Sequence, residues 1–125
     1  MDTIERVTDA VNKAEEAAKD IKREELLQKF GHAHHKLSKP FTYCGETYEE
    51  LDLDFESLTG RMIESIDDEL AAMNININTP SVSHRYQRMV AARAAKVPSD
   101  MIEALPLSDY NAITNAARFF LIVTG

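Results

Sequence analysis

Within the stretch LDLDFESLTG, residues 51–60, the spacing of the apolar residues changes, and this change indicates the fold class of the chain. Leu51, Leu53 and Phe55 alternate with acidic residues, which is the pattern of a strand with one buried and one solvated face. From Leu58 onward the apolar residues recur every three or four positions, as they do along one side of a helix. The stretch therefore predicts a strand that is followed directly by a helix.

The alternation also extends upstream of this stretch. Apolar residues at Phe41 and Tyr43 precede a CGET turn, in which Gly45 supplies the flexible turn residue. Pro40 stands near the start, where a missing backbone donor costs least. We therefore predict a β-hairpin over about residues 39–55.

Downstream, helical spacing and helix-ending residues predict a small bundle. The helices are expected at about residues 57–73, 83–96, 99–105 and 108–123. Ser99 and Ser108 are expected to cap the last two helices, and Pro98 to end the helix before them. The first of the four carries its apolar stripe on Leu58, Met62, Ile66, Leu70 and Met73.

Residues 1–30 predict an amphipathic helical arm. Its apolar residues follow a heptad pattern at Ile4, Val7, Val11, Ala14, Ala18 and Ile21. The thin stripe is compatible with docking on the body, with pairing to a second copy in a homo-oligomer, and with a loosely attached arm. Gly31 is expected to end the arm in a left-handed conformation, and residues 31–38 to form a linker.

The predicted fold class is thus α+β and predominantly helical, with one β-hairpin packed on a small helical bundle. The bundle and hairpin make up one domain, residues 39–125, preceded by the arm. A chain of 125 residues can bury a real core without disulfides or a structural metal.

Composition narrows the class of partner. The formal net charge is −7, which argues against non-specific binding of nucleic acid, because the phosphate backbone favours basic surfaces. Cys44 is the single cysteine and cannot form an intrachain disulfide. We find no signal peptide and no apolar run that could span a membrane, so a cytosolic protein is expected.

The alternating carboxylates of Asp52, Asp54 and Glu56 resemble the start of a calcium loop. An EF-hand loop beginning at Asp52 needs glycine at its sixth position and glutamate at its twelfth. These positions hold Ser57 and Ile63. We therefore interpret the carboxylates as the solvated face of a strand.

The histidines form the other candidate metal cluster. His32, His34 and His35 stand close together, with His84 a potential fourth ligand. No nearby cysteine or carboxylate has zinc-like spacing to them. A solvated segment is favoured over a metal site or a pH-sensing cluster, and no metal and no cofactor is predicted.

The predicted helix at 83–96 carries the basic residues Arg85, Arg88 and Lys96 beside His84. They could form a nucleic-acid face, but the stretch lacks a recognisable DNA-reading context. We expect these side chains to meet carboxylates of the preceding helix or of a partner protein. No phosphate-binding glycine loop and no catalytic motif occurs, so neither an enzyme nor a small-molecule substrate is predicted.

Several sequence elements, taken in order, resemble a known family. They are Pro40, Gly45, Leu51, Leu53, Phe55 and the Leu-Thr-Gly of residues 58–60, then Ala-Arg-Ala at 92–94, Val-Pro at 97–98, Leu-Pro at 105–106 and Asp-x-x-x-Ile at 109–113. This series resembles the phage tail assembly chaperones of the E, 41 and 14 group over about residues 36–122. The arm and the apolar ending RFFLIV depart from the family pattern.

The resemblance implies a non-catalytic protein that acts in the cytoplasm of the infected host and is absent from the mature virion. It implies binding to the tape-measure protein and recruitment of tail-tube subunits during tail assembly. We place the predicted partner surface at the apolar ending, on Phe119, Phe120 and Ile122, together with exposed parts of the first bundle helix or the arm. The alternatives are a nucleic-acid-binding or regulatory helical protein and a structural virion subunit.

Overall fold

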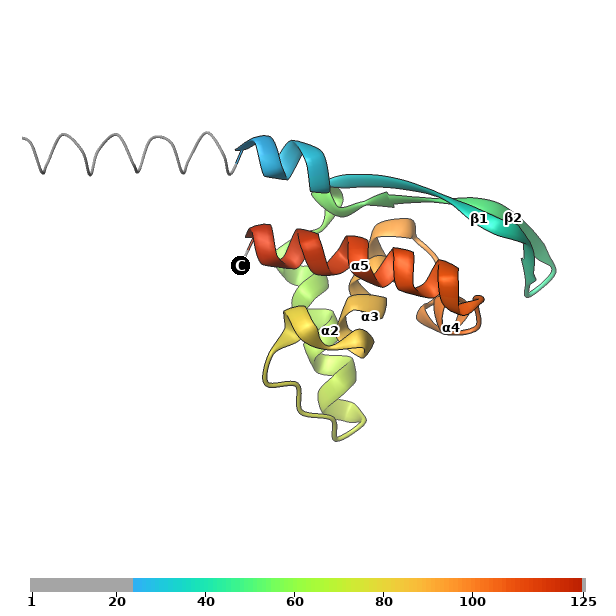
Figure 1. Ribbon diagram of the computed structural model, residues 1–125. Coiled ribbons are helices and arrows are strands. Elements are labelled where there is room, and N and C mark those ends of the chain that lie inside the picture. Colours follow the sequence, from blue (N-terminus) through green and yellow to red (C-terminus); the bar gives the residue numbers. More distant parts are fainter. Residues whose placement is uncertain (1–23, 125) are drawn as a thin grey trace, which may run out of the picture.

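A computed structural model of the chain describes residues 24–124, and these form an α+β domain that is mainly helical (Figure 1). The elements are β1 (His32–Tyr43), β2 (Glu46–Asp54), η1 (Phe55–Ser57), α2 (Gly60–Ala72), η2 (Pro80–Val82), α3 (His84–Ala95), α4 (Ser99–Glu103) and α5 (Leu107–Thr124). Residues 24–30 are helical and are called the leading helix below. The predicted fold class is confirmed. The rest of the predicted arm lies outside the described residues.

The first strand of the hairpin is longer than predicted. β1 begins at His32, so the linker expected at residues 31–38 is in fact strand. Its residues face the acidic side of β2, with His34 opposite Asp52 and Lys36 opposite Glu50. The opposite charges of Lys36 and Glu50 on facing positions stabilise the antiparallel pair. The prediction failed because this part of β1 is polar and shows little apolar alternation.

The hairpin turn lies at Cys44 and Gly45, as the glycine indicated. Tyr43 pairs with Glu46, which leaves a two-residue loop. Both loop residues have positive φ, 49° at Cys44 and 82° at Gly45. Positive φ at both central residues is the type I′ geometry, whose twist matches that of the flanking strands.

The register of the hairpin is irregular between Lys36 and Phe41. Extra residues of β1 oppose fewer residues of β2 there, which interrupts the ladder and turns the bulged chain. Leu37 is buried in the core as a result. Pro40, which has no backbone donor, lies in the same irregular segment, where no ladder bond is lost.

Asp109 of α5 ties this irregular segment to the helical layer. Its carboxylate is almost fully buried and accepts hydrogen bonds from the backbone N–H of Ser38 at 3.0 Å and from the Ser38 hydroxyl at 2.7 Å. His35 Nε2 lies 2.9 Å from the same carboxylate. Burial by itself raises the pKa of Asp109, but the bonds from His35 and Ser38 outweigh it and hold the pKa below its usual value.

Helix boundaries agree with the predicted positions to within a few residues, but two predicted caps are wrong. Ser83 caps α3 by accepting a hydrogen bond from the Tyr86 N–H. Ser99 lies inside α4, whose N-cap is Pro98, and Ser108 lies inside α5. α3 ends before Pro98, because Lys96 adopts a left-handed conformation with φ 58°.

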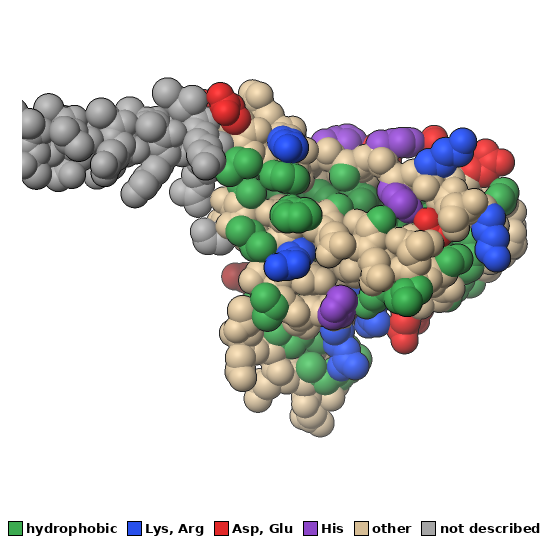
Figure 2. Space-filling view, viewed as in Figure 1, with side chains coloured by type: hydrophobic (Ala, Val, Ile, Leu, Met, Phe, Trp, Pro, Cys, Tyr) green, Lys and Arg blue, Asp and Glu red, His purple; other side chains and the backbone are tan. Residues whose placement is uncertain are grey.

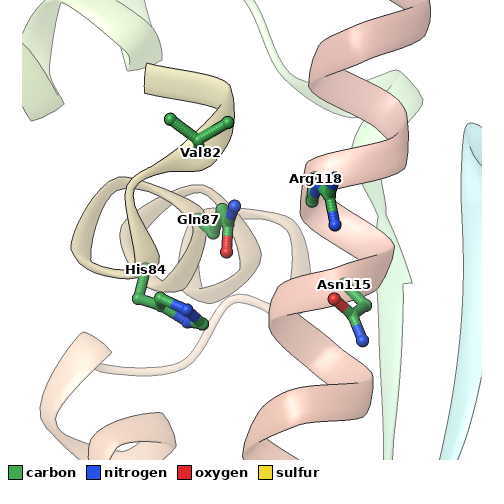
Figure 3. A pocket seen from close by; sticks show the side chains of 5 residues that line it. All are labelled: Val82, His84, Gln87, Asn115 and Arg118. Atoms are coloured by element: carbon green, nitrogen blue, oxygen red, sulfur yellow. The ribbon is translucent and has the colours of Figure 1, made fainter. Parts of the chain in front are cut away.

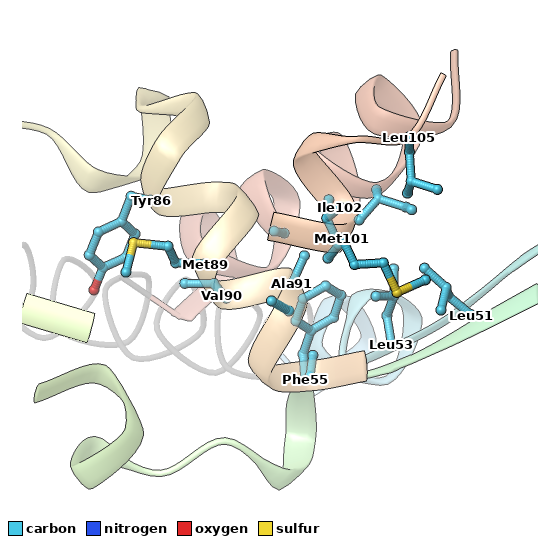
Figure 4. Close-up of a cluster of buried hydrophobic side chains, with 14 of the residues drawn as sticks. Leu51, Leu53, Phe55, Tyr86, Met89, Val90, Ala91, Met101, Ile102 and Leu105 are labelled. Carbon is cyan, nitrogen blue, oxygen red and sulfur yellow. The ribbon is translucent and has the colours of Figure 1, made fainter. Parts of the chain in front are cut away.

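The core forms where the inner face of β2 meets α3 and α4 (Figure 4). Leu51, Leu53 and Phe55 are buried as the alternation predicted. Alanines of α3 at positions 91, 92 and 94 are buried too, and small side chains let neighbouring elements approach closely. Along α2 only Ile66 and Leu70 of the predicted stripe are buried, and Met62 and Met73 are exposed.

Gly31 joins the leading helix to β1, but for a different reason from the one predicted. Its φ is not positive, so no left-handed residue ends the helix there. Its N–H donates to Leu27 and its carbonyl accepts from the Glu56 N–H. A Cβ at this position would lie 2.5 Å from the Leu27 carbonyl oxygen and 2.6 Å from Cγ of Glu56. Glycine is needed here for close approach.

We predict that Gly31→Ala lowers the free energy of unfolding by about 1–3 kcal/mol, because a backbone oxygen cannot move away from the added methyl group. Urea unfolding followed by circular dichroism measures the change. The matched control is Gly60→Ala at the start of α2, where a Cβ meets nothing within 4 Å and the helix gains from alanine. Equal stability of the two variants would contradict this explanation.

We predict that Asp109→Asn lowers the free energy of unfolding at pH 7 by about 1.5–3 kcal/mol, the contribution of hydrogen bonds to a buried charged group. Because the folded-state pKa is lowered, this contribution is fully present above the unfolded-state pKa of about 3.9 and is lost as pH falls through the folded-state value. Urea unfolding at several pH values should therefore show the two proteins converging only in strong acid. The exposed Asp68→Asn is the control and should change stability by less than about 0.5 kcal/mol. A difference that persisted below both pKa values would contradict the assignment.

Candidate partner-binding surface

The end of α5 points its two adjacent phenylalanines in different directions. Successive residues of a helix are about 100° apart around its axis. Phe120 turns inward, is partly buried against the core, and stacks on Phe55 with ring centroids 5.1 Å apart. Phe119 turns outward with 46 % of its surface exposed. Of the three predicted partner-binding residues, Phe120 thus holds the helix on the core.

Phe119 and Ile122 lie together on the outward side, because they are three residues apart on the helix. Ile122 is 53 % exposed. The half-buried ring of Phe30, from the leading helix, stacks on Phe119 with centroids 5.2 Å apart. We call Phe30, Phe119 and Ile122 the apolar end surface. Figure 2 shows hydrophobic side chains gathered where the leading helix meets the end of α5.

Basic side chains border this surface. The Lys29 Nζ atom lies 5.4 Å from the centroid of the Phe30 ring. Arg118 precedes Phe119 and lies one helical turn before Ile122, and it is exposed. Figure 2 shows Lys and Arg side chains on both sides of the hydrophobic group. Within residues 24–124, no ion pair joins Lys29 or Arg118 to a carboxylate.

Arg118 also lines a polar hollow of about 230 Å³ between the start of α3 and α5 (Figure 3). The other lining residues are Val82, His84, Gln87 and Asn115. No carboxylate and no hydroxyl group lines it, so His84 has no acid–base partner among the lining side chains. A second hollow, of about 260 Å³, is lined by Pro80, Ser81, Tyr86, Leu121 and Thr124.

Two arginines of α3 form ion pairs with carboxylates of the same domain. Arg88 pairs with Glu103 of α4 at 3.1 Å and donates to Ser99. Arg93, which the sequence analysis did not single out, pairs with Glu69 of α2 at 2.8 Å. These arginines therefore form ion pairs with carboxylates of both α2 and α4, and not of α2 alone.

The three histidines of β1 each face a carboxylate, which the sequence alone did not reveal. His32 Nε2 lies 2.5 Å from Asp52, and His34 Nε2 lies 3.0 Å from Glu50. The hydrogen bond to Asp52 raises the pKa of His32, since it favours the protonated ring. In residues 24–124 no group of three or more His, Cys, Asp or Glu side chains is arranged to hold a metal ion.

Sequence reasoning allowed the arm to share in the surface beside the apolar ending of α5, but it did not single out Phe30. In the sequence Phe30 is an apolar residue that lies beyond the last heptad position of the arm, Ile21. Its place on Phe119 depends on contacts between residues 89 positions apart. None of the helices in the part of the chain that the structure describes is long and apolar enough to cross a membrane.

Comparison with known proteins gives a family assignment. Residues 34–122 match the family model described as phage tail assembly chaperone proteins, E, or 41 or 14. The match begins in β1 and ends at Ile122 of α5, so it covers the hairpin, the bundle and most of the apolar end surface. No curated protein and no solved structure matches the chain. The matched part is well over half of the chain, which therefore belongs to this family of phage tail assembly chaperones.

Proposed function

We propose that this chaperone binds the tape-measure protein of a phage tail and helps to recruit tail-tube subunits to it. Membership of a chaperone family indicates a non-catalytic role in tail assembly. The proposed site of action is the host cytoplasm, and the protein is proposed to be absent from the mature virion. The observation that carries the proposal, beside the family, is the apolar end surface.

A tape-measure chain presents long amphipathic helices before the tail is complete. Long amphipathic helices carry apolar stripes that aggregate in water unless they are covered. A surface that offers exposed apolar side chains can cover such a stripe, as in other complexes in which a helix is bound along its apolar face. Phe119 and Ile122 are both about half exposed and supply that kind of surface.

The other exposed apolar residues do not form an equivalent surface on α5. Leu107 is 71 % exposed and stands at the start of the helix, more than ten residues before Phe119. Single exposed apolar side chains are normal on soluble proteins and need no partner. Leu107 therefore serves as a matched control for substitutions at the end of α5.

We predict that co-expression of this chain keeps the long helical product of a neighbouring gene soluble, and that Phe119→Asp or Ile122→Asp weakens the complex at least about thirtyfold. Loss of a central apolar contact in an interface typically costs about 2 kcal/mol or more. Co-purification on a tag carried by this chain measures the effect, and Leu107→Asp should leave it unchanged.

Stability of each variant must be measured alongside. Unfolding of the isolated protein by Phe119→Asp or Ile122→Asp would mean that these residues belong to the core. A partner that aggregates equally with and without the wild-type chain would remove the main support for the proposal. Recruitment of tail-tube subunits is tested separately, by asking whether the complex retains a purified tail-tube protein that neither component retains alone.

The competing functions make different predictions. A nucleic-acid-binding protein should be retained on DNA in a salt-sensitive way, because phosphate contacts release counterions. The net charge of −7 disfavours this outcome. A structural subunit should be found in purified particles, where a chaperone that leaves before maturation is absent.

A further inference from the structure

Taking the proposed function as its basis, we infer that the apolar end surface receives an amphipathic helix whose apolar stripe is bordered on both sides by acidic residues. The occupant is a segment of another protein. The inference rests on the shape of the apolar end surface, on the cations beside it and on the sequence of this chain's own arm.

The shape of the surface suits a helix. Phe119 and Ile122 are one turn apart on α5, and Phe30 adds a ring from a second helical segment. Side chains at one-turn spacing on a bound helix can contact side chains at one-turn spacing on α5. Phe120 and Phe55 stack directly behind, so α5 is held on the core while its outer side stays available.

The charges beside the surface indicate which charge the bound helix should carry beside its apolar stripe. Lys29 and Arg118 flank the apolar residues and make no ion pair within residues 24–124. Arg88 and Arg93, by contrast, both pair with carboxylates of the same chain. In a chain of net charge −7, these two cations place positive charge directly beside the apolar residues. Complementary charge at the rim of an interface governs specificity and association rate.

The arm of a second copy is a poorer match for these cations. The positions that flank its heptad stripe hold Thr3, Thr8, Ala10, Glu15, Ala17, Lys22 and Glu24. These positions hold two acidic side chains and one basic side chain and are otherwise neutral. An arm of this kind offers no row of carboxylates on either side of its stripe. We therefore assign the surface to a partner protein and not to another copy of this chain.

The test uses the full-length chain and two designed helical peptides of about 20 residues. Both peptides carry the same leucine stripe, and the positions beside the stripe are all Glu in one and all Lys in the other. Fluorescence anisotropy measures binding of each. The Glu peptide is expected to bind about tenfold more tightly than the Lys peptide.

Three variants locate the effect. Arg118→Glu should reduce or reverse the preference for the Glu peptide, whereas Lys39→Glu changes the net charge equally and should leave it intact, since Lys39 lies on β1 beside the opposite end of α5. Ile122→Asp should weaken both peptides. Arg118→Glu alters an exposed residue, so the test does not depend on a variant that could unfold the protein.

Three results would overturn the inference. Equal binding of the two peptides, or equal effects of Arg118→Glu and Lys39→Glu, would mean that the cations do not choose the occupant. Failure of both peptides to bind would also overturn it. In that case light scattering on the full chain and on Ile122→Asp would tell whether a second copy covers the surface.

This test and that of the proposed function can fail independently. Aggregation of the tape-measure protein in the presence of the wild-type chain would count against the proposed function, whatever the peptides do. A soluble complex that forms equally well with Arg118→Glu, together with charge-insensitive peptide binding, would keep the proposed function and remove this inference.

Discussion

The buried carboxylate of Asp109 is the interaction on which the arrangement of this domain depends. It accepts hydrogen bonds from Ser38 in β1 while standing in the first turn of α5. The ladder irregularity between Lys36 and Phe41 makes this possible, because it frees the Ser38 N–H from strand pairing. A buried charge needs such partners, since removal from water is costly when they are missing. The hairpin and α5 are thereby held in one relative position.

That position decides where the leading helix lies. Gly31 connects the leading helix to β1 without intervening residues, and its carbonyl is bonded to the Glu56 N–H at the other side of the hairpin. Once β1 is fixed along α5, the leading helix must pass close to the opposite end of α5. Phe30 then reaches Phe119, and the two rings stack. The apolar end surface is thus a consequence of how the hairpin is attached.

The hairpin also explains why polar features that suggested chemistry in the sequence serve a different purpose. Asp52 and Glu50 accept hydrogen bonds from His32 and His34, and His35 turns to Asp109. These pairs are diagonal across the two strands, since His32 faces Asp54 and His34 faces Asp52, and diagonal side-chain pairs also stabilise strand pairing. The Asp-x-x-x-Ile element at residues 109–113 likewise has a structural basis, since Asp109 bonds to β1 and Ile113 is fully buried.

Features that arise within a single element could be predicted from the amino-acid sequence. The alternation of Leu51, Leu53 and Phe55 identified the buried face of β2, the glycine at position 45 located the turn, and helical spacing located the bundle helices. Each of these depends on neighbours a few residues away, and backbone periodicity records them directly.

The remaining features depend on contacts between distant parts of the chain. The extension of β1 to His32, the bond from Ser38 to Asp109, and the stack of Phe30 on Phe119 join residues that are far apart in the chain. The sequence of a polar strand has no periodic signal that indicates its partner, and neither has a single serine or a single phenylalanine near a helix end. Their roles depend on which faces of two elements are in contact, and the packing of the whole core determines which faces those are.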